Sequence, residues 1–408
     1  MKHRSKNRRL GEGLARRATC GACVAALLAA QAAPPALAGP YEQAKRIYER
    51  LAGVPPSAAV LQLMANDIIN QPGQSGLLAA AAVATDPGYA PSFYNVTLKE
   101  FVNPWTNRDQ SAFVPLNDYT ATVIGMVRDD VPFNTVLSAD ILYVFANVSG
   151  LPGPSPANDD HYAQAETLGI SMADKTEFIQ TTQSSVYGLP AQATAGVWTT
   201  RAGAQSFFIN GTNRAQFRYT MLNYLCHDMQ TVMDNTRPTD RIRQDVSRSP
   251  GGDSRVFLNN CAGCHSGMDP MAQAFAYYDF SNSSNQLLYT PGHVQPKYLK
   301  NPQNFPWGFV TPDDSWANRW RQGPNADLGW DQSLPGSGVG AKSLGVELES
   351  SEAFANCQVV KVFKAVCLRD PASQADQTAV SGIEQIFKAS DYDLKQVFQQ
   401  SAADCAGS

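Results

Sequence analysis

Two cysteines and a histidine at fixed spacing carry the clearest chemical signal in this sequence. Cys261, Cys264 and His265 form the pattern Cys-x-x-Cys-His, by which haem is attached covalently to proteins. The two thiols become thioethers with the haem vinyl groups, and the imidazole that follows them ligates the iron from one face. The pattern therefore predicts one covalently attached haem c, with His265 as the proximal iron ligand.

Two other kinds of site use similar residues. A zinc site would need a second thiol pair or spaced histidines, whereas the remaining cysteines and histidines are scattered singly along the chain. A redox-active Cys-x-x-Cys pair of the thioredoxin kind would lie in a βαβ pattern, which the sequence does not show. The sequence therefore favours covalent haem over a zinc site or a redox-active thiol pair.

The ligand on the second face of the iron decides between electron transfer and catalysis. No methionine follows Met271, and Met268 and Met271 are too close in sequence to His265 to reach around the haem ring easily. His293 is the only histidine after the motif and is our leading candidate for a second metal ligand. The alternatives are an open position or one of Met221, Met229, Met233, His161 and His227.

The first 38 residues have the pattern of an export signal. Seven basic side chains precede an apolar run from about residue 21 to residue 33, and Ala36-Leu37-Ala38 before Gly39 is typical of a cleavage site. The run is too short and too rich in alanine for a membrane span, and no later stretch approaches ~18 consecutive apolar residues. We expect a bacterial periplasmic or secreted protein without stable membrane insertion after signal removal.

Composition predicts the size of the core, and net charge indicates the kind of binding partner. The 408 residues are 43% hydrophobic and 17% charged, which predicts a sizeable core and two domains. Without residues 1–38 the chain has 25 Lys and Arg against 35 Asp and Glu, a net charge of −10. This negative charge argues against nucleic acid as a binding partner. We expect a redox partner protein with a basic patch, or a small-molecule electron donor or acceptor.

The cysteines agree with export. Two of the eight lie in the signal and two in the haem motif, which leaves Cys226, Cys357, Cys367 and Cys405 for two disulfides in an oxidising compartment. Cys357 and Cys367 lie in one predicted helix, where ten residues rise about 15 Å, so they are too far apart to pair with each other. We expect Cys226 to pair with Cys357, and Cys367 with Cys405.

Helical periodicity dominates both ends of the chain, so we predict a mainly α protein. The expected organisation is a signal peptide (1–38), a helical domain (39–150), a linker or loop segment (151–200) and a helical, haem-binding, cytochrome c-like domain (201–408). Apolar stripes and helix-capping residues place the expected helices at 41–51, 61–68, 77–83, 117–126, 133–145, 212–229, 254–260, 269–278, 354–368, 383–387 and 394–398. The expected N-caps are Thr212, Asp253 or Ser254, and Asp269.

A long stretch from residue 281 to about residue 345 is rich in Trp, Pro and Gly and shows little periodicity. It contains four of the six tryptophans, and we expect it to wrap the haem, although a surface loop stapled by its tryptophans is the alternative. Three arginines shortly before the motif, Arg241, Arg243 and Arg248, are candidates to neutralise the haem propionates.

From about residue 201 onward the chain resembles the cytochrome-like C-terminal domains of secreted planctomycete and proteobacterial proteins. The resemblance rests on Arg201-Ala-Gly203, Tyr224-Leu225-Cys226, the haem motif followed by Met268-Asp269-Pro270, Tyr278-Asp279, Phe354-x-x-Cys357 and Tyr392-x-Leu394. Two departures are Ala276-Tyr277, where Leu-Glu is usual, and an apparent insertion at residues 281–315. The resemblance covers roughly half the chain and implies a mono-haem fold with presumed electron transfer.

Two function classes therefore remain. An exported one-electron carrier is favoured, with haem held by Cys261 and Cys264 and ligated by His265. The alternative is a haem-dependent oxidoreductase of the peroxidase or oxygenase type, in which the sixth iron position is open or displaceable. The alternative stays open because an electron carrier with one haem can be much shorter than this chain.

Overall fold

The computed structural model describes residues 38–106, 113, 115–208, 213–298 and 302–406. The predicted export signal, apart from Ala38, lies outside these residues. Within them helices dominate, and the six strands form three separate two-stranded antiparallel pairs. The predicted mainly α class is confirmed.

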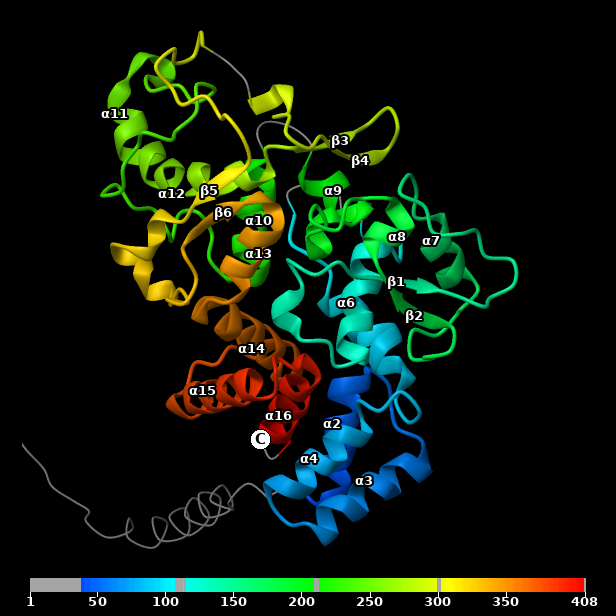
Figure 1. Ribbon diagram of the computed structural model, residues 1–408. Helices are drawn as coiled ribbons and strands as arrows, with labels where there is room; N and C mark the ends of the chain where they lie inside the picture. Colours follow the sequence, from blue (N-terminus) through cyan, green and yellow to red (C-terminus); the bar gives the residue numbers. More distant parts are fainter. Residues whose placement is uncertain (1–37, 107–112, 114, 209–212, 299–301, 407–408) are drawn as a thin grey trace, which may run out of the picture.

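Six of the longer helices come from the two ends of the described chain and pack together (Figure 1). They are α2 (Pro40–Ala52), α3 (Ala58–Asn70), α4 (Gln74–Val83), α14 (Glu352–Cys367), α15 (Gln374–Ala389) and α16 (Leu394–Cys405). Helix α16 contacts α2, α4, α14 and α15, so the last helix closes the core that the first helices begin. The apolar stripes predicted for these segments lie in helices.

Helix α2 shows how local sequence sets these boundaries. Pro40 occupies its first turn, and Gly53 ends it in the left-handed conformation with φ 71°. Between them Ala44, Ile47 and Leu51 form a stripe that is almost completely buried. Burial of this stripe against α16, α3 and α4 holds the helix in place.

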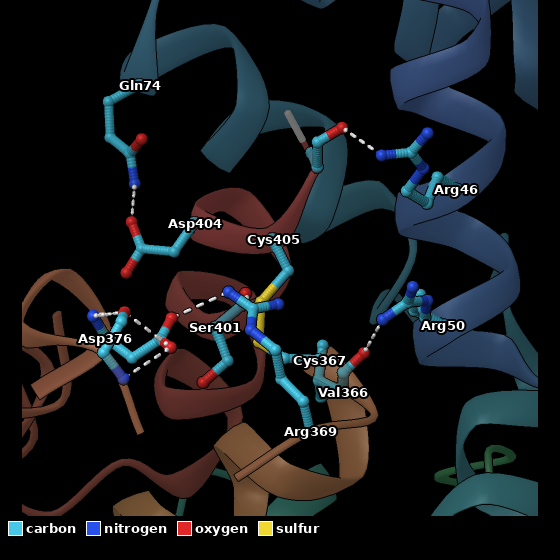
Figure 2. Close-up of a disulfide and its surroundings, with 12 residues drawn as sticks. Arg46, Arg50, Gln74, Val366, Cys367, Arg369, Asp376, Ser401, Asp404 and Cys405 are labelled. Atoms are coloured by element: carbon cyan, nitrogen blue, oxygen red, sulfur yellow. Dashed lines mark hydrogen bonds and ion pairs between the residues drawn. A yellow bond between two sulfur atoms is a disulfide. The ribbon is translucent and has the colours of Figure 1, made fainter. Parts of the chain in front are cut away.

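Both disulfides pair the cysteines as the sequence predicted. Cys226 is joined to Cys357 and Cys367 to Cys405, with Cα–Cα distances of 5.3 and 5.6 Å. Figure 2 shows that the second bridge ties α14 to α16 beside two arginines of α2. Arg50 donates to the carbonyl of Val366 at 2.7 Å, and Arg46 donates to that of Ala406 at 3.2 Å. These cations therefore satisfy carbonyls at the C-terminal ends of two helices.

The middle of the predicted N-terminal domain differs from expectation. Helix α6 (Asp118–Arg128) lies where a helix was predicted and is capped by Asn117, but the prediction of a helix at 133–145 is wrong. A 3₁₀ turn (Phe133–Thr135) is followed by strand β1 (Leu142–Phe145), which pairs with β2 (Phe178–Thr181). All four residues of β1 are buried, and periodicity cannot distinguish a fully buried strand from a helix segment.

Residues 151–200, predicted as a linker or loop, contain several regular elements. Helices α7 (Asp160–Thr167) and α8 (Gln183–Tyr187), strand β2 and a 3₁₀ turn (Gly196–Thr199) lie there. Gln183 donates to the carbonyls of Ile141 and Gly196 at 3.0 and 2.7 Å, which ties the segment to β1 and to the 3₁₀ turn. Because this contact is made by a polar side chain, no periodic apolar pattern in the sequence indicated that the segment is part of the fold.

The remaining elements complete the described chain. They are a π turn (Phe93–Thr97), α5 (Leu98–Phe101), α9 (Arg201–Phe207), α10 (Arg214–Tyr224), a 3₁₀ turn (Pro250–Gly252), α11 (Ser254–Val256), a π turn (Phe257–Cys261), α12 (Ala262–Ala272), a 3₁₀ turn (Gln273–Phe275), β3 (Tyr278–Ser281), β4 (Gln286–Tyr289), 3₁₀ turns (Pro296–Tyr298, Arg319–Arg321, Pro324–Leu328), β5 (Ser315–Ala317), β6 (Ser337–Val339) and α13 (Gly340–Glu349).

Two expected helix boundaries in this part are corrected. Helix α10 ends at Tyr224 rather than extending through Met229, and its N-cap is Asn213, whereas Thr212 lies outside the described residues. Where a helix was expected to begin at Asp269, residues 269–272 are instead the last turn of α12, which runs unbroken past Pro270. Proline removes one helical hydrogen bond, but here the neighbouring contacts of α12 keep the helix continuous.

A single large cluster of buried apolar side chains runs from Ala44 to Ala406 and includes residues on both sides of position 200. A small second cluster of Ile242, Phe257 and Ala262 lies beneath the first turn of α12. No helix within the described ranges is both long enough and apolar enough to cross a membrane.

Candidate haem site

One face of α12 brings the three residues of the haem motif together. Asp253 accepts a hydrogen bond from Arg255 N at 2.9 Å and caps α11, as predicted, and the π turn then leads to Cys261. Cys264 and His265 follow at three and four positions, a spacing that places side chains on the same side of a helix. The local fold therefore presents both thiols and the imidazole in one direction.

Both thiols of the motif are free and half-buried. Burial raises the pKa of the Cys264 thiol, with smaller contributions from Cys261 and Asp228. The apolar side chains of Val256 and Leu258, just before the motif, are 39% and 58% exposed. Cys264 packs against the main apolar core and Cys261 against the small cluster of Ile242, Phe257 and Ala262, so each thiol is partly covered.

Two glycines hold the opposite face of α12 against the rest of the protein. A Cβ at Gly263 would lie 2.3 Å from Met233 Cγ, and one at Gly267 would lie 2.0 Å from Trp320 Nε1. Asp234 N also donates to the carbonyl of Gly263 at 3.1 Å. Because only glycine permits these approaches, the helix is fixed with its cysteine face turned away from the contact.

The imidazole of His265 is oriented by a carboxylate one helical turn further along. His265 Nδ1 lies 3.0 Å from Oδ1 of Asp269, and the side chain of Asp269 has no exposed surface. In a neutral imidazole whose Nδ1–H donates to this carboxylate, Nε2 keeps a lone pair for a metal. Among the described residues, no hydrogen bond to Nε2 competes for that lone pair.

Asp269 belongs to a buried network of charges. Arg214 reaches both of its oxygens, at 2.9 and 3.2 Å, and reaches both oxygens of Asp245 at 2.7 and 3.0 Å. Arg243, which is fully buried, lies 3.7 Å from Oδ1 of Asp269. Burial alone would raise the pKa of Asp269, but Arg214, His265 and Arg243 together hold it well below its ordinary value. The carboxylate beside His265 is therefore charged.

These residues fit a covalently attached haem. The two free thiols stand at the spacing that haem attachment requires, and the His265 Nε2 is left for iron by the hydrogen bond at Nδ1. The exposed Val256 and Leu258 add an apolar surface beside them. Cys261 and Cys264 would hold the group, and His265 would ligate its iron.

The structure does not join His293 to this site. His293 is exposed, and its backbone bonds to Thr290, while Gln295 N bonds to Ala276 O beyond the C-terminal end of α12. No hydrogen bond or ring contact in the described part of the chain links it to His265. His293 as a second iron ligand stays a prediction without support from these contacts.

The other candidate ligands occupy different surroundings. Both ring nitrogens of His161 are engaged, with Phe145 N at 2.9 Å and the Pro152 carbonyl at 2.7 Å, so this histidine is structural. Met221 is fully buried, and His227 borders a separate cavity of about 400 Å³.

The segment after α10 contacts the motif at two points. Cys264 Sγ donates to the carbonyl of Met229 at 3.3 Å, and Met233, which is 42% exposed, lies against Gly263. Met229 and Met233 were alternative iron ligands in the sequence. Met229 meets Cys264 through its backbone carbonyl, and Met233 contacts Gly263 on the face of α12 opposite the cysteines, so neither contact supports a role in iron ligation.

The tryptophan-rich stretch and the arginines have structural contacts. Trp316, Trp320 and Trp330 are buried whereas Trp307 is 86% exposed, and Trp320 packs on the back of α12. This position supports the helix from the side opposite to the cysteines.

Two of the arginines proposed for the propionates are likewise engaged within the protein. Arg243 lies in the Asp269 network, and Arg248 donates to three backbone carbonyls and stacks on Phe257 and Phe305. Arg241 donates to Gln273 at 3.3 Å.

Sequence reasoning missed the role of Asp269, which it treated as a helix cap. The signal was present in the spacing, because Asp269 follows His265 by four residues and therefore shares its helix face. Recognising it required α12 to be read as one helix through Asp269-Pro270.

Comparison with known proteins does not extend this description. No family model, curated protein or solved structure matches the chain. Within the described residues, no three His, Cys, Asp or Glu side chains gather into a group that would hold a metal ion.

Proposed function

We propose that this chain is an exported mono-haem c-type cytochrome of the one-electron carrier kind. The observation that carries the proposal is the shared face of α12, where two free thiols and an imidazole oriented through Nδ1 stand at the spacing for haem attachment. Haem bound there would supply one-electron transfer through its iron. The resemblance to secreted cytochrome-like domains supports the same class.

The chain's own residues would provide attachment, orientation and surroundings. Cys261 and Cys264 would fix the haem edge, and His265, held by Asp269, would keep its imidazole plane constant between oxidation states. The residues left after removal of the predicted signal are acidic, so electrostatic steering favours a partner with a basic surface. Export into the periplasm or the medium belongs to this proposal and rests on the pattern in residues 1–38.

Covalent attachment is the direct test. The full chain is produced in a host with haem-attachment machinery, and its intact mass and reduced absorption spectrum are measured. We expect one haem in the unchanged protein and none that survives denaturation in the double variant Cys261→Ala/Cys264→Ala.

The matched control is Ser254→Ala, an exposed change seven residues before the motif, which should retain the haem. Circular dichroism shows whether each variant is folded. An unchanged protein that is folded, disulfide-bonded and free of covalent haem would contradict the proposal.

A haem-dependent oxidoreductase is the second candidate, and one observation favours it. A carboxylate that accepts a hydrogen bond from the Nδ1–H of a metal-bound histidine makes the imidazole a stronger electron donor, which also suits oxidative chemistry at an iron with a free position. Carbon monoxide added to the reduced protein separates the two functions. A large shift of the Soret band favours the oxidoreductase, and an unchanged band favours the carrier.

A further inference from the structure

The contact between His265 and Asp269 brings a full negative charge to the imidazole that faces the proposed haem. Asp269 Oδ1 lies 3.0 Å from His265 Nδ1, and Asp269 is completely removed from solvent. Water therefore does not screen this charge, and its effect on a near neighbour is larger than that of a surface carboxylate.

The carboxylate is fixed in place by partners on other elements. Arg214 of α10 binds both oxygens of Asp269 while it also binds Asp245, and Arg243 approaches from the segment between α10 and α11. His265 and Asp269 stand one turn apart on a single helix, which Gly263 and Gly267 seat against the protein. The imidazole is thus held in one orientation by a rigid and charged support.

We propose that Asp269 is a positioning residue that orients His265 and lowers the reduction potential of the haem. The inference rests on the proposed function. A carboxylate that accepts a hydrogen bond from Nδ1–H increases electron donation from the imidazole to iron, which stabilises the more positive ferric state over the ferrous state. Of the charged groups in the network, Asp269 is the one in hydrogen-bond contact with His265.

Asp245 provides a matched comparison within the same network. It binds Arg214 with two hydrogen bonds, as Asp269 does, but makes none with His265. Asp245→Asn and Asp269→Asn remove the same charge from the same arginine with nearly the same change in shape. A difference between the two variants therefore reports the contact with the histidine.

The experiment measures the midpoint potential of each purified holoprotein by spectroelectrochemical titration. Covalent haem is first confirmed by mass, so a failure of the proposed function is seen before any potential is compared. We expect Asp269→Asn to retain haem and to shift the potential to more positive values, with a clearly smaller shift in Asp245→Asn. Equal shifts in the two variants, or no shift in Asp269→Asn, would overturn the inference.

A measurement on the unchanged protein decides the question if Asp269→Asn does not fold. The ferric protein is examined by electron paramagnetic resonance, with an imidazole-ligated haem peptide as the reference. A carboxylate-bonded His265 should shift the g-values in the direction produced by deprotonating the reference imidazole. Values equal to those of the neutral reference would overturn the inference.

Discussion

Two buried carboxyl groups in this protein have opposite electrostatic surroundings. Asp269, in α12, has no exposed surface and contacts Arg214 and Arg243. Glu349, at the end of α13, is 2% exposed and contacts the hydroxyl of Ser138 and the backbone N–H of Leu137. The cations hold the pKa of Asp269 well below its ordinary value, whereas burial raises the pKa of Glu349 to about 8.

The difference shows where the protein maintains a charge in its interior. Taking a carboxylate out of water costs free energy in both places, and neutral hydrogen bonds at Glu349 offset less of that cost than two arginines do at Asp269. The ionised carboxylate is the one next to His265, in the candidate haem site. The neutral one joins α13 to the turn after Phe133 and has no charged partner among its hydrogen bonds.

Removal of the main cation should have the largest effect. Arg214→Ala leaves Asp269 and Asp245 without their bidentate partner, and breaking a buried ion pair in this way costs about 3–5 kcal/mol of unfolding free energy. Urea unfolding at neutral pH measures the loss. Arg255→Ala, which breaks the exposed ion pair with Asp253, is the control and should leave the midpoint unchanged. Similar midpoints for the two variants would remove the distinction between the charged site and the surface.

Replacement of Glu349 by glutamine should change the pH dependence of stability. The folded-state pKa of about 8 lies above the ordinary value of 4.5, so the stabilising contribution of Glu349 is fully present below pH 4.5 and is lost as pH rises through 8. Glu349→Gln has no proton to lose and should become more stable than the unchanged protein at pH 8.5, by on the order of 2 kcal/mol.

Unfolding free energies of both proteins at pH 5 and at pH 8.5 test this expectation. At pH 5 the carboxyl of the folded protein is neutral, as the amide is, and this pH lies close to the ordinary pKa of 4.5, so the two proteins should differ little and this pH acts as an internal control. A constant difference across the range would show that Glu349 does not change its charge.

Loss of one neutral hydrogen bond should have the smallest effect. Ser138→Ala removes the hydroxyl partner of Glu349 but leaves the N–H of Leu137 in place, and a single such bond contributes about 1 kcal/mol. The loss is measured by urea unfolding at pH 5. A loss as large as that of Arg214→Ala would mean that neutral and charged partners support a buried carboxyl equally.

The sequence predicted the parts of the fold in which local pattern and burial coincide. The stripe in α2 and those in α14 and α16 were recognised because their apolar residues recur once per turn. The distance along one helix excluded a bond between Cys357 and Cys367 but left two other connectivities open, and the one that we expected is present. In β1 every residue is buried, so no alternation marked the strand.

The sequence predicted the motif of the candidate site but not the charged residues that surround His265. Cys261, Cys264 and His265 are adjacent in sequence and were identified directly. The charges behind His265 were not, because Arg214 lies 55 residues before Asp269 and the two meet only through the packing of α10 on α12. Met229 was one of several candidate ligands far from the motif in sequence, and only the fold places its carbonyl beside Cys264.

The packing of α16 on α2 and α4 also bears on the order in which contacts form during folding. Arg46 and the carbonyl of Ala406 are separated by 360 residues, so nearly the whole chain must be synthesised before they can meet. Closing so long a loop costs chain entropy before its contacts form, which makes such contacts slow to appear during folding. Helices α2 to α4 therefore gain their contacts with α16 late in folding. The Cys367–Cys405 bridge spans only 38 residues, so α14 and α16 can pair before that.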